Sequence, residues 1–250
     1  YLGSKRLAIQ DLSNSAFMPM LSDDKRYAIV FNGEVYNFQL LRKRLRDIGF
    51  SFNSGSDTEV VLKSYIHYGV DCLNYLEGMF AVAIYDMINE ELFLARDRIG
   101  EKPLYVWENS DGISFASQMN QLFLSPTLNR DLDYNALHDY LSYGYVNNDK
   151  TLVEGIKKIL PGTFLKYSFK KKRSTIKKYW EIPSYSVNHY SQKELTEKLD
   201  ELLRNSVKKQ LISDVPVGVL LSGGIDSSLI TAYASELSKN KLQTFHISLG

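Results

Sequence analysis

The sequence predicts an α+β domain followed by the beginning of an α/β domain. Two observations lead to this fold class. Up to about residue 180, short apolar segments occur in pairs with helical segments between and after them, a pattern typical of antiparallel sheets covered by helices. From residue 215 onward, an apolar strand, a glycine turn and a helical pattern follow one another, which is typical of a parallel strand–helix unit.

Length and composition narrow the class of protein. The chain has 250 residues, enough for two domains, and its 44% hydrophobic and 24% charged residues are those of a soluble globular protein. A net charge of +1 argues against a general attraction to nucleic acid or membranes, and no apolar run reaches the roughly 18 residues of a spanning helix. The single cysteine, Cys72, fits a reducing compartment, so we expect a cytoplasmic protein. Because Tyr1 is not a start methionine and residues 244–249 are typical of a strand just completed, we expect a fragment truncated at both ends.

The first strand, residues 27–31, runs directly into Asn32 and Gly33. Asn-Gly after a strand normally indicates a hairpin turn. Here a helix that ends at Gly49 follows instead, so the pair needs another function. A glycine N–H beside an asparagine amide supplies two converging donors, which is how an oxyanion hole is built. The apolar face of the helix that follows consists of Leu41, Leu45 and Ile48.

The next helix begins within residues 55–59, where Asp57 is explained equally well as an N-cap and as a ligand. Its expected core face is Val61, Tyr65 and Tyr68. Two hairpins should follow, from strands at 79–85 with 91–96 and at 103–107 with 113–116, before a helical patch from Ser117. We expect the charged connection 97–103 to be a solvated loop with salt bridges.

A helix at 134–143 that ends at Gly144 and a hairpin of 163–169 with 176–180 complete the first domain. The basic run at the hairpin tip lacks a second basic element, which argues against nucleic-acid binding. Proline, serine and tyrosine at 183–186 indicate a linker, so the predicted domains are 1–183 and 184–250. A capping box at Ser191 and Glu194 then begins a helix with its apolar face at Leu195, Leu199, Leu202 and Val207.

The second domain opens with a strand that we expect to be buried, at Val217, Val219, Leu220 and Leu221. A turn at residues 222–224 and a helix from Asp226, with Leu229, Tyr233 and Leu237 along one side, follow it. Free N–H groups at such a helix start bind anions. No Gly-Lys-Ser/Thr follows, so this is not the usual P-loop. The four histidines show no metal-binding spacing, and Cys72 lacks a cationic neighbour, which predicts an inert core thiol.

The run 222–228, Ser-Gly-Gly-Ile-Asp-Ser-Ser, resembles the SGGxDS loop of PP-loop ATP pyrophosphatases. This resemblance implies an α/β PP-loop domain that binds ATP and Mg²⁺, with Asp226 helping to carry the metal. The implied ATP-binding residues are Leu220, Ser222, Gly223, Gly224, Asp226, Ser227 and Ile247.

Ahead of this loop, a series of motifs resembles the glutaminase domain of glutamine-hydrolysing asparagine synthetases. They are Leu2-Gly3 with Arg6-Leu7-Ala8-Ile9, Asn32-Gly33-Glu34-Val35-Tyr36-Asn37, Gly55-Ser56-Asp57, Gly78-Met79-Phe80-Ala81 and Ala95-Arg96-Asp97-Arg98-Ile99-Gly100. The resemblance implies a class II glutamine amidotransferase domain with an Ntn-hydrolase-like α-β-β-α sandwich. It also implies that both ends of the domain pair are missing here.

By this resemblance, Arg6 holds the carboxylate of glutamine, as a two-pronged guanidinium can. Asn32 and Gly33 form the oxyanion hole, and Glu34 and Asp57 hold the α-ammonium group. Where many relatives have a histidine before the Arg-Leu pair, this chain has Ser4 and Lys5.

The implied enzyme is a carbon–nitrogen ligase with two sites. An N-terminal cysteine, expected upstream of Tyr1, attacks glutamine and releases ammonia; Cys72 has no α-amine and cannot replace it. ATP adenylates the side chain of aspartate, and ammonia displaces AMP to give asparagine, AMP and pyrophosphate. Members of this family are often homodimers. The fragment alone is expected to be inactive.

Three alternatives stay open at this point. The acceptor could be another carboxylate or a sugar of a surface polysaccharide, because the motifs serve only glutamine and ATP. The chain also resembles β-lactam synthetases, although the intact glutamine-site residues argue against them. A non-catalytic paralogue that binds glutamine or nucleotide is the third alternative. Glucosamine-6-phosphate synthases and phosphoribosyl amidotransferases share the first domain but lack the loop at 222–228.

Overall fold

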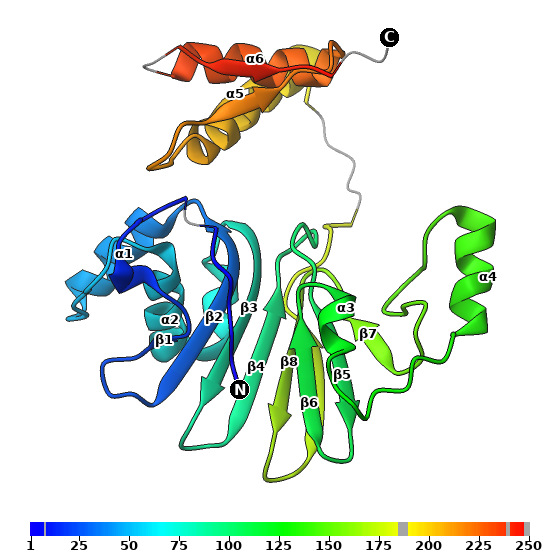
Figure 1. Cartoon of the computed structure of the whole chain (residues 1–250). Coiled ribbons are helices and arrows are strands. Elements are labelled where there is room, and N and C mark those ends of the chain that lie inside the picture. Colours follow the sequence, from blue (N-terminus) through cyan, green and yellow to red (C-terminus); the bar gives the residue numbers. More distant parts are fainter. Residues whose placement is uncertain (8, 185–189, 239–240, 248–250) are drawn as a thin grey trace. The chain divides into compact units, whose positions relative to one another are not determined.

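The computed structural model describes residues 1–7, 9–184, 190–238 and 241–247. The chain divides into two compact units (Figure 1). The first comprises Tyr1–Arg6 and Ser13–Ile182, and the second comprises Leu7–Leu12 and Pro183–Gly250. The predicted linker at 183–186 lies partly outside the described residues.

A six-stranded sheet forms the centre of the first unit, in the order β1-β2-β3-β4-β8-β9. All neighbouring strands are antiparallel, because the chain mostly returns through hairpins. The predicted pairs around residues 79–96 and 163–180 are therefore confirmed. The strands are β1 Met20–Leu21, β2 Tyr27–Val35, β3 Gly78–Asp86, β4 Glu91–Arg96, β8 Thr163–Ser168 and β9 Arg173–Lys178.

A second sheet in this unit has three strands, in the order β6-β5-β7. Strands β5 (Tyr105–Asn109) and β6 (Gly112–Ala116) form the remaining predicted hairpin, and β7 (Ile156–Lys158) pairs with the other edge of β5. The predicted strands are thus correct in type, although the first begins later than expected.

The helices of the first unit follow the predicted order. Gly49 and Gly144 follow α1 and α4 with positive φ angles of 99° and 78°, as residues that end helices often do. The elements are the short 3-10 helix η1 Asn14–Ala16, α1 Phe38–Asp47, α2 Asp57–Tyr68, the 3-10 helix η2 Gly69–Asn74, α3 Met119–Leu122 and α4 Tyr134–Tyr143.

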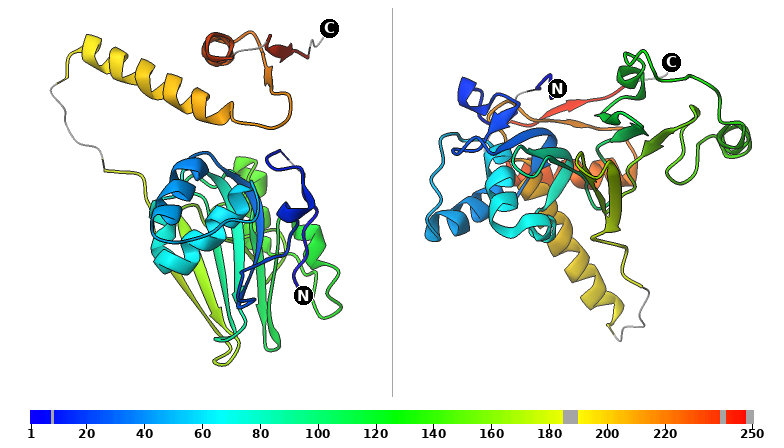
Figure 2. Two further views of the ribbon diagram at one scale, coloured as in Figure 1. Left: turned by 90° about the vertical axis from the view of Figure 1, so that its left-hand side faces the viewer. Right: turned by 90° about the horizontal axis from the view of Figure 1, so that it is seen from below.

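Three apolar clusters give the layer order of the first unit. The first packs α1, α2 and η2 on one face of the six-stranded sheet, through residues such as Leu45, Val61 and Phe80. The second joins the opposite face to the three-stranded sheet, and the third lies between that sheet and α3. Figures 1 and 2 show α1 and α2 along one face of the larger sheet. The predicted α-β-β-α sandwich is therefore confirmed.

The second unit is a strand–helix–strand unit preceded by a long helix. Helix α5 (Gln192–Gln210) begins with the predicted capping box of Ser191 and Glu194. Strands β10 (Gly218–Leu220) and β11 (Gln243–Phe245) are parallel, and α6 (Ile225–Leu237) connects them. This parallel arrangement confirms the α/β prediction. The segment 7–12 joins this unit through the Asp11 N–H, which donates to Asp214 Oδ2 at 2.8 Å.

The expected burial of the second unit is confirmed only in part. Leu220 is 76% exposed in β10, and Leu199 and Leu202 on α5 are 57% and 68% exposed. Val207 and Tyr233, which both lie on predicted apolar faces, are buried and form a small core with Ala234. The apolar pattern indicated buried faces, but among the described residues of this unit no element covers them. No helix in the described part of the chain is long and apolar enough to cross a membrane.

Candidate functional site

The first predicted site lies along the edge of β2 that faces away from β3, beyond the two residues that pair with β1. In an antiparallel strand, the N–H groups of alternate residues point to opposite sides. The Phe31 N–H donates to Met18 Sδ at 3.1 Å and the Val35 N–H donates to Asp57 Oδ2 at 2.9 Å, whereas the Tyr36 N–H turns inward to Glu77 O. The N–H of Gly33 therefore points to the same outer edge as those of Phe31 and Val35. Such a donor is available to a ligand.

Close packing of β2 against β3 explains why residue 33 is a glycine. A Cβ atom there would lie 2.1 Å from Met79 O. Gly78 stands in the reciprocal position, where a Cβ would lie 2.0 Å from Glu34 O. The glycine itself is thus required by strand packing. Only the direction of its N–H bears on an oxyanion hole.

The side chain of Asn32 points away from the helical layer. Its amide nitrogen lies 3.3 Å from Ser117 Oγ, just after β6. Residues of the same parity in β2, such as Val30, pack toward the second sheet. Ser117 was missed by sequence reasoning because only the packing of the two sheets brings it to Asn32.

Asp57 is not the N-cap of α2. Ser56 holds that position, and its hydroxyl accepts a hydrogen bond from the Thr58 N–H at 3.1 Å. Asp57 is instead the first helical residue and only 5% exposed. Its carboxylate accepts a hydrogen bond from the N–H of Val35, at the end of β2. The interpretation of Asp57 as the N-cap is wrong by one residue. Ser56 and Asp57 are adjacent, and serine and aspartate are both favoured N-cap residues.

Electrostatics link Asp57 with Arg6. Burial raises the pKa of Asp57, while hydrogen bonds from Val35, Thr58 and Ser56 and the positive charge of Arg6 act in the opposite direction. A buried carboxylate needs such partners to remain charged. Arg6 is thus near enough for its charge to favour the Asp57 carboxylate, with a smaller effect than burial and the hydrogen bonds.

Glu34 is half-buried and follows the two oxyanion-hole candidates in β2. Its charge, with that of Glu101, acts on the neighbouring Tyr36, and burial first and these carboxylates second raise the pKa of Tyr36 to about 12. Tyr36 therefore stays a neutral phenol at ordinary pH.

The connection 97–103 is not a solvated, salt-bridged loop. Asp97 is fully buried, and its carboxylate accepts hydrogen bonds from the N–H of Phe80 in β3 and from N–H groups within the connection, including that of Lys102. Arg96 donates to the carbonyl oxygens of Gly100, Lys102 and Ile159. The charges organise the backbone instead of pairing with each other, which no local pattern could reveal.

The second predicted site is the loop between β10 and α6. Gly223 has φ of +85°, in the region that favours glycine, and Gly224 begins the helix without a side-chain cap. Ser222 Oγ lies 2.9 Å from Ser227 Oγ, and Ser227 Oγ donates to Gly224 O at 3.1 Å. The two serines therefore close the loop, and Ser222 Oγ also accepts a hydrogen bond from the Gly224 N–H at 3.5 Å. The loop leads into a helix start, which is a place where anions can bind.

The other predicted nucleotide residues lie in the same unit. The carboxylate of Asp226 is exposed in the first turn of α6, and Ile247 follows β11. Leu220 and Ile247 are exposed, so they have apolar surface to offer a ligand. Within the part of the chain that the structure describes, no group of three or more histidine, cysteine, aspartate or glutamate side chains could hold a metal by itself.

Cys72 is a core residue, as predicted. It is 1% exposed, and burial raises its pKa to about 12. A neutral, enclosed thiol is neither a nucleophile nor a metal ligand.

Two family models match this chain. Residues 1–180 match the model described as glutamine amidotransferase domain, and residues 198–250 match the model described as asparagine synthase.

Curated relatives show the same combination. The chain is 37% identical over 98% of its length to asparagine synthetase [glutamine-hydrolyzing] 1 of Bacillus subtilis, and 38% identical over 93% to asparagine synthetase [glutamine-hydrolyzing] 3 of that organism. It spans 38% of the length of each relative. A glutamine phosphoribosylpyrophosphate amidotransferase structure from B. subtilis is 17% identical with a TM-score of 0.45, covering 94% of this chain and 49% of that one.

Proposed function

Because the chain belongs to the glutamine amidotransferase domain family, we propose that the protein releases ammonia from glutamine and uses it, with ATP, to form an amide. The preferred acceptor is aspartate, which makes the protein a carbon–nitrogen ligase that forms asparagine, AMP and pyrophosphate. The observation that carries this proposal is the second match, to asparagine synthase, in the same chain as the first. We assign residues 1–183 to the glutamine amidotransferase domain and residues 184–250 to the ATP-binding domain as part of this proposal.

At the glutamine site, Arg6 binds the α-carboxylate, and Asp57 with Glu34 binds the α-ammonium group. The contact between the Val35 N–H and Asp57 supports this assignment, because it fixes a buried carboxylate at the edge of β2. The Gly33 N–H on that edge and the Asn32 amide stabilise the oxygen of the tetrahedral intermediate. Donors fixed before the reaction cost no reorganisation when charge develops.

The nucleophile is not within residues 1–250 under this proposal. Cys72 is the chain's single cysteine, and its buried thiol stays protonated. A cysteine with its own α-amine as the base would attack the side-chain amide of glutamine, release ammonia and leave a thioester that water hydrolyses.

At the synthetase site, the Ser222–Ser227 loop and the start of α6 bind the pyrophosphate end of ATP. The start of α6, where backbone N–H groups and the helix dipole favour anions, and the exposed Asp226 support this role. Mg²⁺ fits as a partly protein-bound ion, because it is often held by one or two carboxylates together with phosphates. Asp226 would hold it, and the ion would neutralise phosphate charge. A cytoplasmic location and a homodimer belong to the proposal on the family resemblance alone.

The proposal is tested with the protein that has its native ends, supplied with glutamine, ATP, Mg²⁺ and aspartate. Asparagine, AMP and pyrophosphate should form in equal amounts. The variant Asp226→Asn should lose ATP-dependent amide formation and keep glutamine hydrolysis, because the two sets of residues fall in separate units.

The other outcomes are equally informative. If glutamine is hydrolysed but no asparagine forms, the acceptor is a compound other than aspartate. Binding of glutamine or ATP without turnover of either would overturn the proposal in favour of a non-catalytic paralogue.

A further inference from the structure

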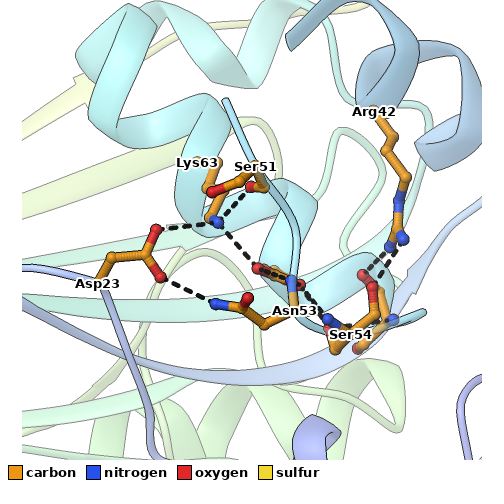
Figure 3. Close-up of polar contacts among 8 residues, drawn as sticks. Asp23, Arg42, Ser51, Asn53, Ser54 and Lys63 are labelled. Atoms are coloured by element: carbon orange, nitrogen blue, oxygen red, sulfur yellow. Dashed lines mark hydrogen bonds and ion pairs between the residues drawn. The ribbon is translucent and has the colours of Figure 1, made fainter. Parts of the chain in front are cut away.

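A cluster of charged side chains lies beneath the segment 51–56, which leads into Asp57 (Figure 3). Three of its members come from helices: Arg42 from α1, and Glu59 and Lys63 from α2. The side chains of Glu59 and Lys63 are only 5% and 4% exposed. Two buried charges on one helix are costly unless each has several partners, so their contacts deserve an explanation.

Glu59 binds the backbone of the segment. Its carboxylate accepts hydrogen bonds from the N–H of Asn53 at 2.9 Å and the N–H of Ser54 at 2.8 Å, and from the Ser54 hydroxyl at 2.7 Å. Burial acts to raise the pKa of Glu59, but the bonds from Ser54 and Asn53 and the charge of Lys63 outweigh it and leave the pKa lowered. Glu59 is therefore an anion that accepts the hydrogen bonds of backbone N–H groups in a segment that has no helix or strand to accept them.

Lys63 and Arg42 bind the carbonyl groups of the same segment. Lys63 Nζ lies 2.9 Å from Glu59 Oε1 and donates to Ser51 O. Arg42 donates through both terminal nitrogens, to Ser54 O at 2.7 Å and to Ser56 O at 2.8 Å. Side chains from two helices thus fix a connection that is neither helix nor strand.

The fixed segment ends at Asp57. Arg42 binds the carbonyl of Ser56, the residue directly before Asp57, and Glu59 is one helical turn from the cluster's other anchor, Lys63. The Asp57 carboxylate meets the Val35 N–H at 2.9 Å. A shift of the segment would therefore move Asp57 along the edge of β2, and small displacements of a binding group cost large factors in rate.

We propose that Glu59, held by Lys63 and working with Arg42, is a positioning residue that presents Asp57 to the α-ammonium group of glutamine. This inference rests on the proposed function, in which Asp57 binds that group. It adds a second set of residues whose charges determine how well the site distinguishes glutamine from analogues without the amine. A purely structural cluster would affect both substrates equally.

The test measures kcat/KM for glutamine and for 4-carbamoylbutanoate, which is glutamine without its α-amine, in the protein with its native ends. Glu59→Gln keeps the size of the side chain, removes the charge and directs an amide N–H₂ toward existing donors. The selectivity for glutamine should fall about tenfold or more. Asp57→Asn should abolish the selectivity.

The matched control is Asp86→Asn, which breaks the ion pair of Arg26 with Asp86 (2.7 Å) elsewhere on the same sheet. Its selectivity should stay within about twofold of the parent even if its melting temperature falls. If Glu59→Gln does not fold, Ser54→Ala removes one bond to Glu59 and leaves the buried charges paired. This milder variant should also lose selectivity, by a smaller factor.

The outcomes separate the two proposals. Unchanged selectivity in Glu59→Gln or Ser54→Ala, with Asp57→Asn impaired, would overturn the positioning role and keep the glutamine site. Unchanged selectivity in Asp57→Asn would overturn the glutamine site itself. An equal loss for both substrates in Glu59→Gln would reduce the cluster to a structural role.

Discussion

The two units of this chain use their apolar residues in different ways. In the first unit, three clusters close between successive layers, and residues such as Leu94 and Ile29 are fully buried. In the second, Val207, Tyr233 and Ala234 form a small cluster, while Leu199 and Leu220 remain mostly exposed. Both units have the periodic patterns of buried elements. The difference shows that a pattern indicates which face is apolar, whereas burial depends on a second element that covers it.

The largest expected effect contrasts a leucine from each unit. Leu94→Ala should destabilise the first unit by about 3 kcal/mol, because it leaves a cavity between two sheets. Leu199→Ala should change stability by less than about 0.5 kcal/mol, since the side chain is mainly exposed.

Urea unfolding followed by tryptophan fluorescence reports the first unit, because Trp107 and Trp180 both lie there. Amide hydrogen exchange of α5 reports the second. A Leu199→Ala loss as large as that of Leu94→Ala would show that α5 is covered in solution.

The second contrast is between glycines. Gly33→Ala should cost about 3 kcal/mol, because the new methyl group would meet the backbone of β3, which cannot yield without parting the strands. Gly49→Ala, at φ of 99° with nothing within 4 Å of the methyl group, should cost only about 1 kcal/mol. Thermal melts of both variants measure the difference. Equal melting temperatures would contradict the close approach of β2 and β3.

The third contrast compares the carboxylates of the two candidate sites. Burial raises the pKa of Asp57 in the folded protein. The protonated carboxyl therefore contributes to the free energy of unfolding in full below the ordinary pKa of 3.8, and this contribution is lost as pH rises through the raised pKa. At pH 7 its charge is therefore a cost that Asp57→Asn removes. We expect an equal or higher melting temperature together with a roughly 100-fold higher KM for glutamine.

Acidification should weaken glutamine binding by the parent as Asp57 takes up its proton, and Asp57→Asn should lack this limb of the pH profile. Asp226→Asn, at an exposed position, is the control and should leave the melting temperature unchanged. A lower melting temperature for Asp57→Asn with an unchanged KM would make Asp57 a structural residue.

The most local effect concerns the start of α5. Ser191→Ala removes the side chain that bonds the Glu194 N–H and should cost about 1 kcal/mol. Because α5 has little tertiary burial, this loss should appear as faster amide exchange in its first turn, without a change in the unfolding of the first unit. Unaltered exchange would mean that packing, not capping, stabilises this helix end.

Local sequence signals predicted most elements of the first unit, although they ended the first strand at residue 31, whereas β2 continues through Asn32 and Gly33 to Val35. They failed where a distant backbone decides the outcome. Ser56 and Asp57 are both capping types, and only the Val35 N–H distinguishes them. Asp97 sits among charges, yet converging N–H groups make its burial favourable. The Glu59–Lys63 spacing of four residues was visible, but it is also typical of a solvated helix face.

The regular spacing of β2 has a further consequence for the proposed glutamine site. The N–H groups of Gly33 and Val35 leave one edge two residues apart, about 7 Å along the strand. Under the proposed function the Gly33 N–H would face the reacting amide, and the Val35 N–H binds Asp57, the carboxylate proposed to bind the amine. In that proposal the spacing along one strand would set the length of substrate that the site accepts. Asparagine is shorter than glutamine by one methylene group, so in the proposed site it should not span both positions, and the proposed glutaminase should spare the amide that the proposed synthesis forms.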